Sequence, residues 1–332
     1  MKQLNSLDYL KAYAIIAVLF LHLLPYNYLI KTFAQFHIWQ AVPIFVLLMG
    51  YTFTLSFNKV SFETINWFLY FSKKIKRIVF PVIVINSILF FLDLVLKKEL
   101  IQWNFLFNII PLYQGSGTYF ILIAIESIFV LPIIYYLHRY MDNTKLFLLI
   151  MFFLNILIEF IALNNAFLNN SFNHSANILR FVFLIALGMY LYSNEDKNEK
   201  LFKLLSLFSF FYLLIWGILK FDTPFVVNSK SWQNYFSYLY TYIFVYYFFK
   251  ILENYKERIQ ILILIGKASW HIFLIQVAYF GMDLKRIFFE FISSYISNYM
   301  LNGLITIIFS ITIILYIGIL WYKFEKRLLF DN

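Results

Sequence analysis

Residues 8–29 read DYLKAYAIIAVLFLHLLPYNYL. A helix needs about 20 mainly apolar residues to cross a bilayer, so this run is long enough to span a membrane. Gly266 and Lys267 interrupt a later run of the same kind, whose start is the least regular. The sequence therefore predicts an all-α, polytopic integral membrane protein. We expect about ten transmembrane helices, near residues 8–29, 38–57, 78–96, 117–138, 145–163, 176–193, 201–219, 234–250, 261–281 and 301–322.

The composition supports a membrane protein. Hydrophobic residues make up 62% of the 332 positions and charged residues 13%, whereas a soluble domain has roughly 45–50% and about 25%. One globular core cannot bury that excess, because burial grows slowly with chain length. The chain has no cysteine, which excludes disulfides, a thiolate nucleophile and a cysteine metal site. No linker is visible, so we expect residues 1–332 to form a single integral membrane domain.

The distribution of basic residues predicts the orientation. With the N-terminus in the cytoplasm, the inner segments hold most of the Lys and Arg residues, including Lys73, Lys74, Lys76 and Arg77. This is the bias of the positive-inside rule, and an even number of spans then puts both termini in the cytoplasm. We expect the bacterial cytoplasmic membrane. Because topology explains the net charge of +10, no nucleic-acid partner is expected.

Lys11 and His22 are the sharpest catalytic candidates. They are eleven positions apart, which is about three helical turns, so the two side chains share one face about 16 Å apart. Ionisable groups within a membrane are costly and mark functional sites by default. A histidine that is neutral at pH 7 can take a proton from a hydroxyl, as a general base does. The alternative is a histidine near the outer interface that hydrogen-bonds a neighbouring helix.

The basic cluster Lys73, Lys74 and Arg77 is a candidate cofactor site. It lies in FSKKIKRIVFP, at the cytoplasmic side of the third predicted span. Such a cluster suits the phosphates of a nucleotide-like cofactor, and Arg can bind them bidentately. The alternative is contact with anionic lipid headgroups alone.

Two further charges, Glu126 and Arg180, lie inside predicted spans. Either could bind a substrate hydroxyl or another substrate group, or could be a structural partner in a buried pair. We expect Asp93 and Glu159, nearer helix ends, to be solvated.

The remaining histidines and several other chemistries contribute no candidate. We expect His37, His138 and His174 to be surface residues. QGSGTY does not match a nucleophile elbow, and the chain has no Walker A, paired GxGxxG or HExxH sequence. No His and carboxylate recur at ligand spacing, so we expect no metal.

Taken together, five segments resemble the acyltransferase 3 family of bacterial membrane acyltransferases. Lys11 and His22 match that family's R/K-x10-H signature, and KKIKRIVFP resembles its RxxR segment, with Lys74 and Arg77 in the basic places. The others are VPIFVLLMGY, RFVFLIALGMYL and IGKASWHIFLIQ, which resemble VPLFFxLSGY, an FxLG helix and IGxxSYxIYLxH. Three positions depart from the pattern: Met49 replaces Ser, Lys74 replaces Arg, and Gln276 replaces a common His.

The resemblance implies transfer of an acyl group, usually acetyl, from cytoplasmic acyl-CoA to a hydroxyl. The acceptor would be a cell-surface polysaccharide or its lipid-linked precursor. His22 would be the general base, Lys11 would align the acyl-CoA, and Lys73, Lys74 and Arg77 would hold the CoA phosphates.

Two other functions fit a multi-helix chain. One is a transporter or flippase for a polysaccharide or lipid-linked glycan, which would not need the Lys11–His22 pair together with a CoA site. The other is a membrane glycan polymerase, which would need more outer-face chemistry than the short outer loops offer.

Overall fold

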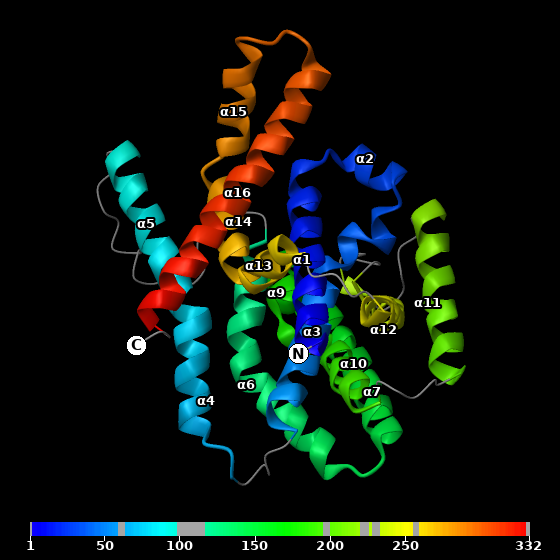
Figure 1. Ribbon diagram of the computed structural model, residues 1–332. Helices are drawn as coiled ribbons and strands as arrows, with labels where there is room; N and C mark the ends of the chain where they lie inside the picture. Colours follow the sequence, from blue (N-terminus) through cyan, green and yellow to red (C-terminus); the bar gives the residue numbers. More distant parts are fainter. Residues whose placement is uncertain are drawn as a thin grey trace.

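The computed structural model describes residues 2–58, 64–97, 117–194, 200–219, 226–227, 233–254 and 259–329. Within these ranges the chain is helical and has no strand. The elements, shown in Figure 1, are α1 (Lys2–Leu23), α2 (Tyr26–Lys31), η1 (Ala34–Phe36), η2 (Ile38–Gln40), α3 (Ala41–Phe57), α4 (Trp67–Lys74), η4 (Ile75–Val79), α5 (Phe80–Lys97), α6 (Tyr119–Tyr140), α7 (Thr144–Asn164), α8 (Ala166–Asn169), α9 (Ser171–Ala176), η6 (Ile178–Phe181), α10 (Val182–Ser193), α11 (Lys200–Leu219), α12 (Tyr238–Asn254), α13 (Gln260–Lys267), α14 (Ser269–Gly281), α15 (Leu284–Ser293) and α16 (Tyr299–Leu329).

In the part of the chain that the structure describes, fewer than ten helices have the length and hydropathy of a membrane span. Among the described residues, six helices are long and apolar enough to cross a membrane, or seven if α13 and α14 count as one bent span. Two expected spans form shorter apolar helices, Ile178–Ser193 and Tyr238–Leu252. The all-helical class is confirmed, but the count of ten and the position of the termini are not. Most of the outer stretches 97–116 and 220–233 lies outside the described residues.

Asparagines determine where several helices begin. The side chain of Asn143 accepts hydrogen bonds from the amides of the first turn of α7, and Asn165, Asn170 and Asn177 do the same for α8, α9 and η6. Asn66 caps α4 in this way. An N-cap side chain satisfies amides that have no partner within the helix. The short helices that follow α7 are therefore encoded locally by the Asn-rich sequence.

The centre of the bundle is built from α1, α3 and α10. Every residue of α10 from Val182 to Leu191 is buried. α3 and α10 approach each other through two glycines: a Cβ on Gly50 would overlap the carbonyl of Ile185, and one on Gly188 would overlap the carbonyl of Leu47. Small residues allow this close backbone approach, which drives helix association in a membrane.

The break between α13 and α14 lies where the sequence is irregular. The two helices meet at an angle of 68°, immediately after Gly266 and Lys267. Gly266 packs directly on the backbone of Asp8 in α1, with no room for a Cβ. The bend therefore keeps α13 against the first helix and changes the direction of α14, whose Phe280 still reaches His22 of α1.

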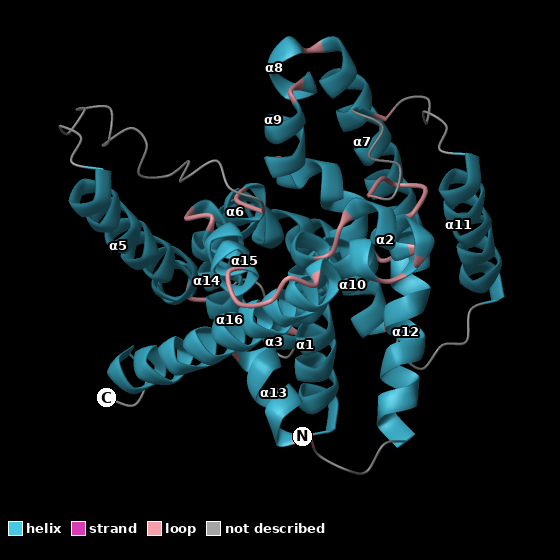
Figure 2. Cartoon of the chain, turned by 90° about the horizontal axis from the view of Figure 1, so that it is seen from above, coloured by secondary structure: helices cyan, strands magenta, loops and turns pink. Residues whose placement is uncertain are grey.

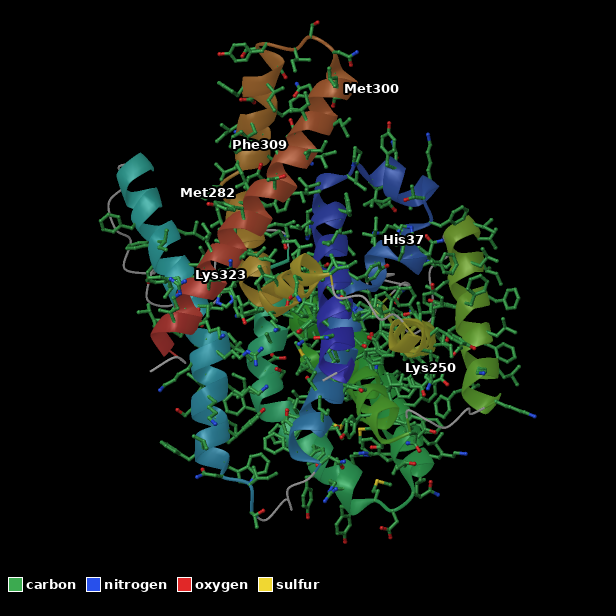
Figure 3. The ribbon with its side chains drawn as sticks, viewed as in Figure 1. His37, Lys250, Met282, Met300, Phe309 and Lys323 are labelled. Carbon is green, nitrogen blue, oxygen red and sulfur yellow. The ribbon has the colours of Figure 1, made fainter. Side chains whose placement is uncertain are left out.

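The periphery of the bundle is strongly apolar. α5 and α11 lie on opposite sides of the molecule in both views (Figures 1 and 2). The α15–α16 hairpin projects beyond the bundle, with Met282 near its base and Met300 at its tip (Figure 3). Large exposed apolar side chains cover the outward faces of α6, α7, α11 and α16, among them Phe129, Ile133, Phe153, Leu157, Phe208, Ile218, Leu304 and Ile308. Such a surface is suited to a bilayer and not to water.

Candidate active site

Three residues predicted from sequence meet in one cavity. Lys11 of α1, Lys74 of α4 and Arg77 of η4 line a cavity of about 500 Å³, a size typical of small-molecule sites. Lys267 of α13 and Lys326 of α16 also line it. We call it the basic cavity. Its charged lining residues are Lys11, Lys74, Arg77, Lys267, Glu325 and Lys326. The excess of cations favours an anionic ligand.

The arrangement of Lys74 and Arg77 follows from the local helix geometry. α4 ends at Lys74, and η4, which carries Arg77, is a π-helical turn between α4 and α5. π-Helical turns are rare in proteins, and those that occur are often found at functional sites. Burial, followed by the like charges of Arg77 and Lys11, lowers the pKa of Lys74 to about 8. Crowding of cations at this point is the electrostatic signature of an anion site.

The other basic candidates differ from these two. Lys73 is exposed and is not among the described residues that line the basic cavity. Lys11 is partly buried, and its Nζ lies 3.9 Å from Oδ1 of Asp8, one turn earlier in α1. The cavity thus unites both members of the RxxR-like pair with the lysine of the first helix, but leaves out Lys73.

His22 lies in the last turn of α1, outside the residues that line the basic cavity. Its ring packs against Phe280 of α14, with 5.5 Å between ring centroids. The Lys285 ammonium donates to the carbonyl oxygens of Leu23 and His22, at 3.0 and 3.4 Å. A cation on the last carbonyls satisfies the C-terminal end of a helix. Lys285 therefore holds the turn of α1 that carries His22.

A second polar pair in the basic cavity involves His271 of α14 and Glu325 of α16. His271 Nε2 lies 2.8 Å from Glu325 Oε2, and both side chains are buried. His271 Nδ1 has no hydrogen-bond partner among the described residues. Sequence reasoning missed this pair, because the two residues are far apart in the chain. The segment IGKASWHIFLIQ was its one local signal, since it also contains Lys267, Trp270 and Phe273 of the cavity wall.

Glu126 and Arg180 have protein partners in the structure. Glu126 Oε2 accepts a hydrogen bond of 2.8 Å from the Ile178 amide at the start of η6. Arg180 is 1% exposed and donates to the carbonyl oxygen of Gln233 and to His174 Nδ1, the latter at 3.2 Å. Neither residue lines the basic cavity. Their role in substrate binding stays a prediction.

The expectations for His174, Glu159 and His138 were wrong. His174 and Glu159 are 2% and 1% exposed, and His174 Nε2 lies 2.9 Å from Glu159 Oε2. With Arg180 they form a chain of hydrogen bonds, Arg180 to His174 to Glu159, that links η6, α9 and α7. His138 is also buried, with Nε2 3.2 Å from Ser193 Oγ. Proximity to a helix end did not expose these groups, because neighbouring helices cover them.

His37 and Asp93 add no residue to the candidate site. The ring of His37 is partly exposed, with Nε2 2.7 Å from the Thr32 carbonyl oxygen. Asp93 lies on α5, but its side chain is outside those that the structure describes. In the described part of the chain, no group of three or more His, Asp or Glu residues is arranged to hold a metal ion.

Comparison with known families settles the class of protein. The model of the acyltransferase 3 family, described as an acyltransferase domain, matches residues 4–322. The chain belongs to the acyltransferase 3 family. The match confirms the resemblance that rested on five short segments, and it makes the protein an acyltransferase. No curated protein and no solved structure matched the chain.

Membership in the acyltransferase 3 family gives the cavity a chemical context. The chain combines several apolar, membrane-length helices with an acyltransferase domain, so it is a membrane acyltransferase. Lys11 in the cavity wall lies near the middle of α1, and His22 lies at its C-terminal end, about three helical turns further on.

Proposed function

We propose that this protein is a membrane O-acyltransferase. It moves an acyl group, in the first instance acetyl, from cytoplasmic acyl-CoA to a hydroxyl of a cell-surface polysaccharide or its lipid-linked precursor. The observation that carries this proposal is the union of Lys11, Lys74 and Arg77 in one cavity. CoA is rich in phosphate, and a group of two partly buried lysines and an exposed arginine is suited to binding phosphate.

The transfer itself needs one base and good positioning. An imidazole nitrogen of His22 takes the proton from the acceptor hydroxyl, whose oxygen attacks the thioester carbonyl carbon. A carbon–oxygen bond forms, the carbon–sulfur bond breaks, and the CoA thiolate leaves and takes up a proton. The thioester is already activated, so no covalent enzyme intermediate is required.

The spatial division of α1 supports these roles. Lys11 and His22 lie about 16 Å apart along the helix, so the phosphates can be held near Lys11 while the acyl group is used near His22. Lys11, in the cavity wall, aligns the donor. Lys285 holds the last turn of α1 and thereby orients His22.

Transport without chemistry is the alternative. Family membership favours acyl transfer over transport without chemistry. The orientation, with the basic cavity on the cytoplasmic side, follows from the positive-inside bias and is part of the proposal.

The test uses purified protein in detergent and radiolabelled acetyl-CoA. We would measure acetyl-CoA binding, and acetyl transfer to a membrane polysaccharide fraction, for wild type, His22→Ala and Arg77→Ala. We expect Arg77→Ala to weaken binding, whereas His22→Ala binds normally but does not transfer. Lys73→Ala is the matched control, because Lys73 is a neighbouring lysine outside the cavity. Folded wild type that binds no acetyl-CoA, or full transfer by His22→Ala, would contradict the proposal.

A further inference from the structure

A row of aromatic rings forms one part of the wall of the basic cavity. Phe45 of α3, Phe120 of α6, and Trp270 and Phe273 of α14 all line the cavity. Ring centroids are 5.8 Å apart for Phe45 and Phe120, 5.3 Å for Phe120 and Phe273, and 5.6 Å for Trp270 and Phe273. We call these four residues the aromatic wall. Three separate helices contribute to it, so it is a tertiary feature.

One residue of the aromatic wall, Phe273, lies close to His22. A Cβ built on Gly117 would lie 3.5 Å from Phe273 Cε2 and 3.7 Å from His22 Nε2. The Phe273 ring therefore borders the basic cavity and also reaches the immediate neighbourhood of His22. Gly117 has a φ of 97°, which other residues rarely adopt, and its lack of a side chain leaves this approach open.

The two central rings are firmly held. Phe120 is 5% exposed and Phe273 is 4% exposed, and each packs edge to face against the other. Close-packed side chains do not move easily to make room for additional atoms. We therefore expect these rings to limit how far an acyl group can extend from the cavity past Phe273 toward His22.

We infer that Phe120 and Phe273 set the upper length of the acyl group that the enzyme accepts. This inference rests on the proposed function, because it takes the basic cavity as the acyl-CoA site. The cations at the other part of the wall hold the CoA phosphates, and the rings limit the space for the acyl end. Longer acyl chains overlap sterically with the rings, whereas the contacts to the CoA part of the donor do not change with chain length.

The test compares acyl-CoA donors of increasing length. Affinities for free CoA, acetyl-CoA, butyryl-CoA and hexanoyl-CoA would be measured with wild type, Phe120→Leu and Phe273→Leu. Phe249→Leu is the matched control, because Phe249 is also 4% exposed but lies in α12, away from the cavity. Pockets distinguish single methylenes by roughly 10- to 200-fold, so we expect wild type to bind hexanoyl-CoA at least about 10-fold more weakly than acetyl-CoA.

The variants separate the inference from the proposed function. We expect Phe273→Leu and Phe120→Leu to reduce the preference for acetyl-CoA over hexanoyl-CoA by about 10-fold, because hexanoyl-CoA binds more tightly. The affinity for free CoA should not change. Phe249→Leu should leave the ratio as in wild type. If wild type binds all acyl-CoAs equally, or if the cavity variants keep the wild-type ratio, the length limit is wrong while the acyl-CoA site stands. Absence of any acyl-CoA binding by folded wild type would overturn both.

Discussion

His271 Nε2 lies 2.8 Å from Glu325 Oε2, and this hydrogen bond joins α14 to α16 at the wall of the basic cavity. His271 also contacts the rings of Trp321 and Tyr322 edge to face. This polar contact helps to hold α16 against α14. Apolar surface alone would not do so, because lipid is as apolar as the surface of a neighbouring helix.

Breaking this contact from one side should destabilise the protein. His271→Ala or Glu325→Ala leaves the remaining buried group without its partner, which costs about 1–3 kcal/mol. Thermal unfolding in detergent would measure it, with Glu290→Ala as control, because Glu290 is exposed. The double variant should cost less than the sum of the two single variants. Strict additivity would show that the two residues are not coupled.

Donor affinity should fall as pH rises from 7 to 9. Lys74 has a pKa of about 8. A lysine is charged below its pKa and neutral above it, so this cation is lost within that interval. Acetyl-CoA affinity measured by titration should therefore decrease, while Lys74→Arg, which stays charged, should flatten the profile.

Lys73 provides the control for this pH profile. Lys73→Arg changes an exposed neighbour outside the basic cavity and should keep the wild-type profile. A wild-type affinity that is constant between pH 7 and pH 9 would contradict the prediction that loss of the Lys74 charge in this interval weakens donor binding.

The α3–α10 contact should not tolerate a single added methyl group. Gly50→Ala and Gly188→Ala each place a Cβ against a backbone carbonyl of the facing helix, so the helices must separate. Overpacking of this kind costs about 1–3 kcal/mol. Gly303→Ala is the control, because nothing lies within 4 Å of the position of its Cβ. Equal melting temperatures for all three variants would contradict the described packing.

Arg180→Ala should reduce the amount of folded protein. Arg180 is fully buried and bonded to Gln233 and His174, and removing one member of a buried ionic network costs about 3–5 kcal/mol. Fluorescence-detected size exclusion would measure the folded fraction. Arg139→Ala, on the exposed end of α6, should behave as wild type. A stable Arg180→Ala protein that binds acceptor weakly would instead support the prediction that Arg180 contacts substrate.

The sequence by itself determined the all-helical membrane class, the family, and the Lys11, Lys74 and Arg77 candidates. These features depend on short stretches of sequence. Hydropathy predicts the length of each spanning segment, and helical geometry predicts that Lys11 and His22 share a face. The family resemblance rests on short segments as well. The break at Gly266 and Lys267 was visible in the same way.

The tertiary structure alone decided which helices surround the site. It brought His271 to Glu325, placed Phe273 in the wall of the basic cavity and close to His22, buried Glu159 and His174, and shortened two expected spans. The physical reason is that lipid is as apolar as a helix interface. A membrane helix can therefore be hydrophobic on every side, and its pattern does not show which face is packed against protein.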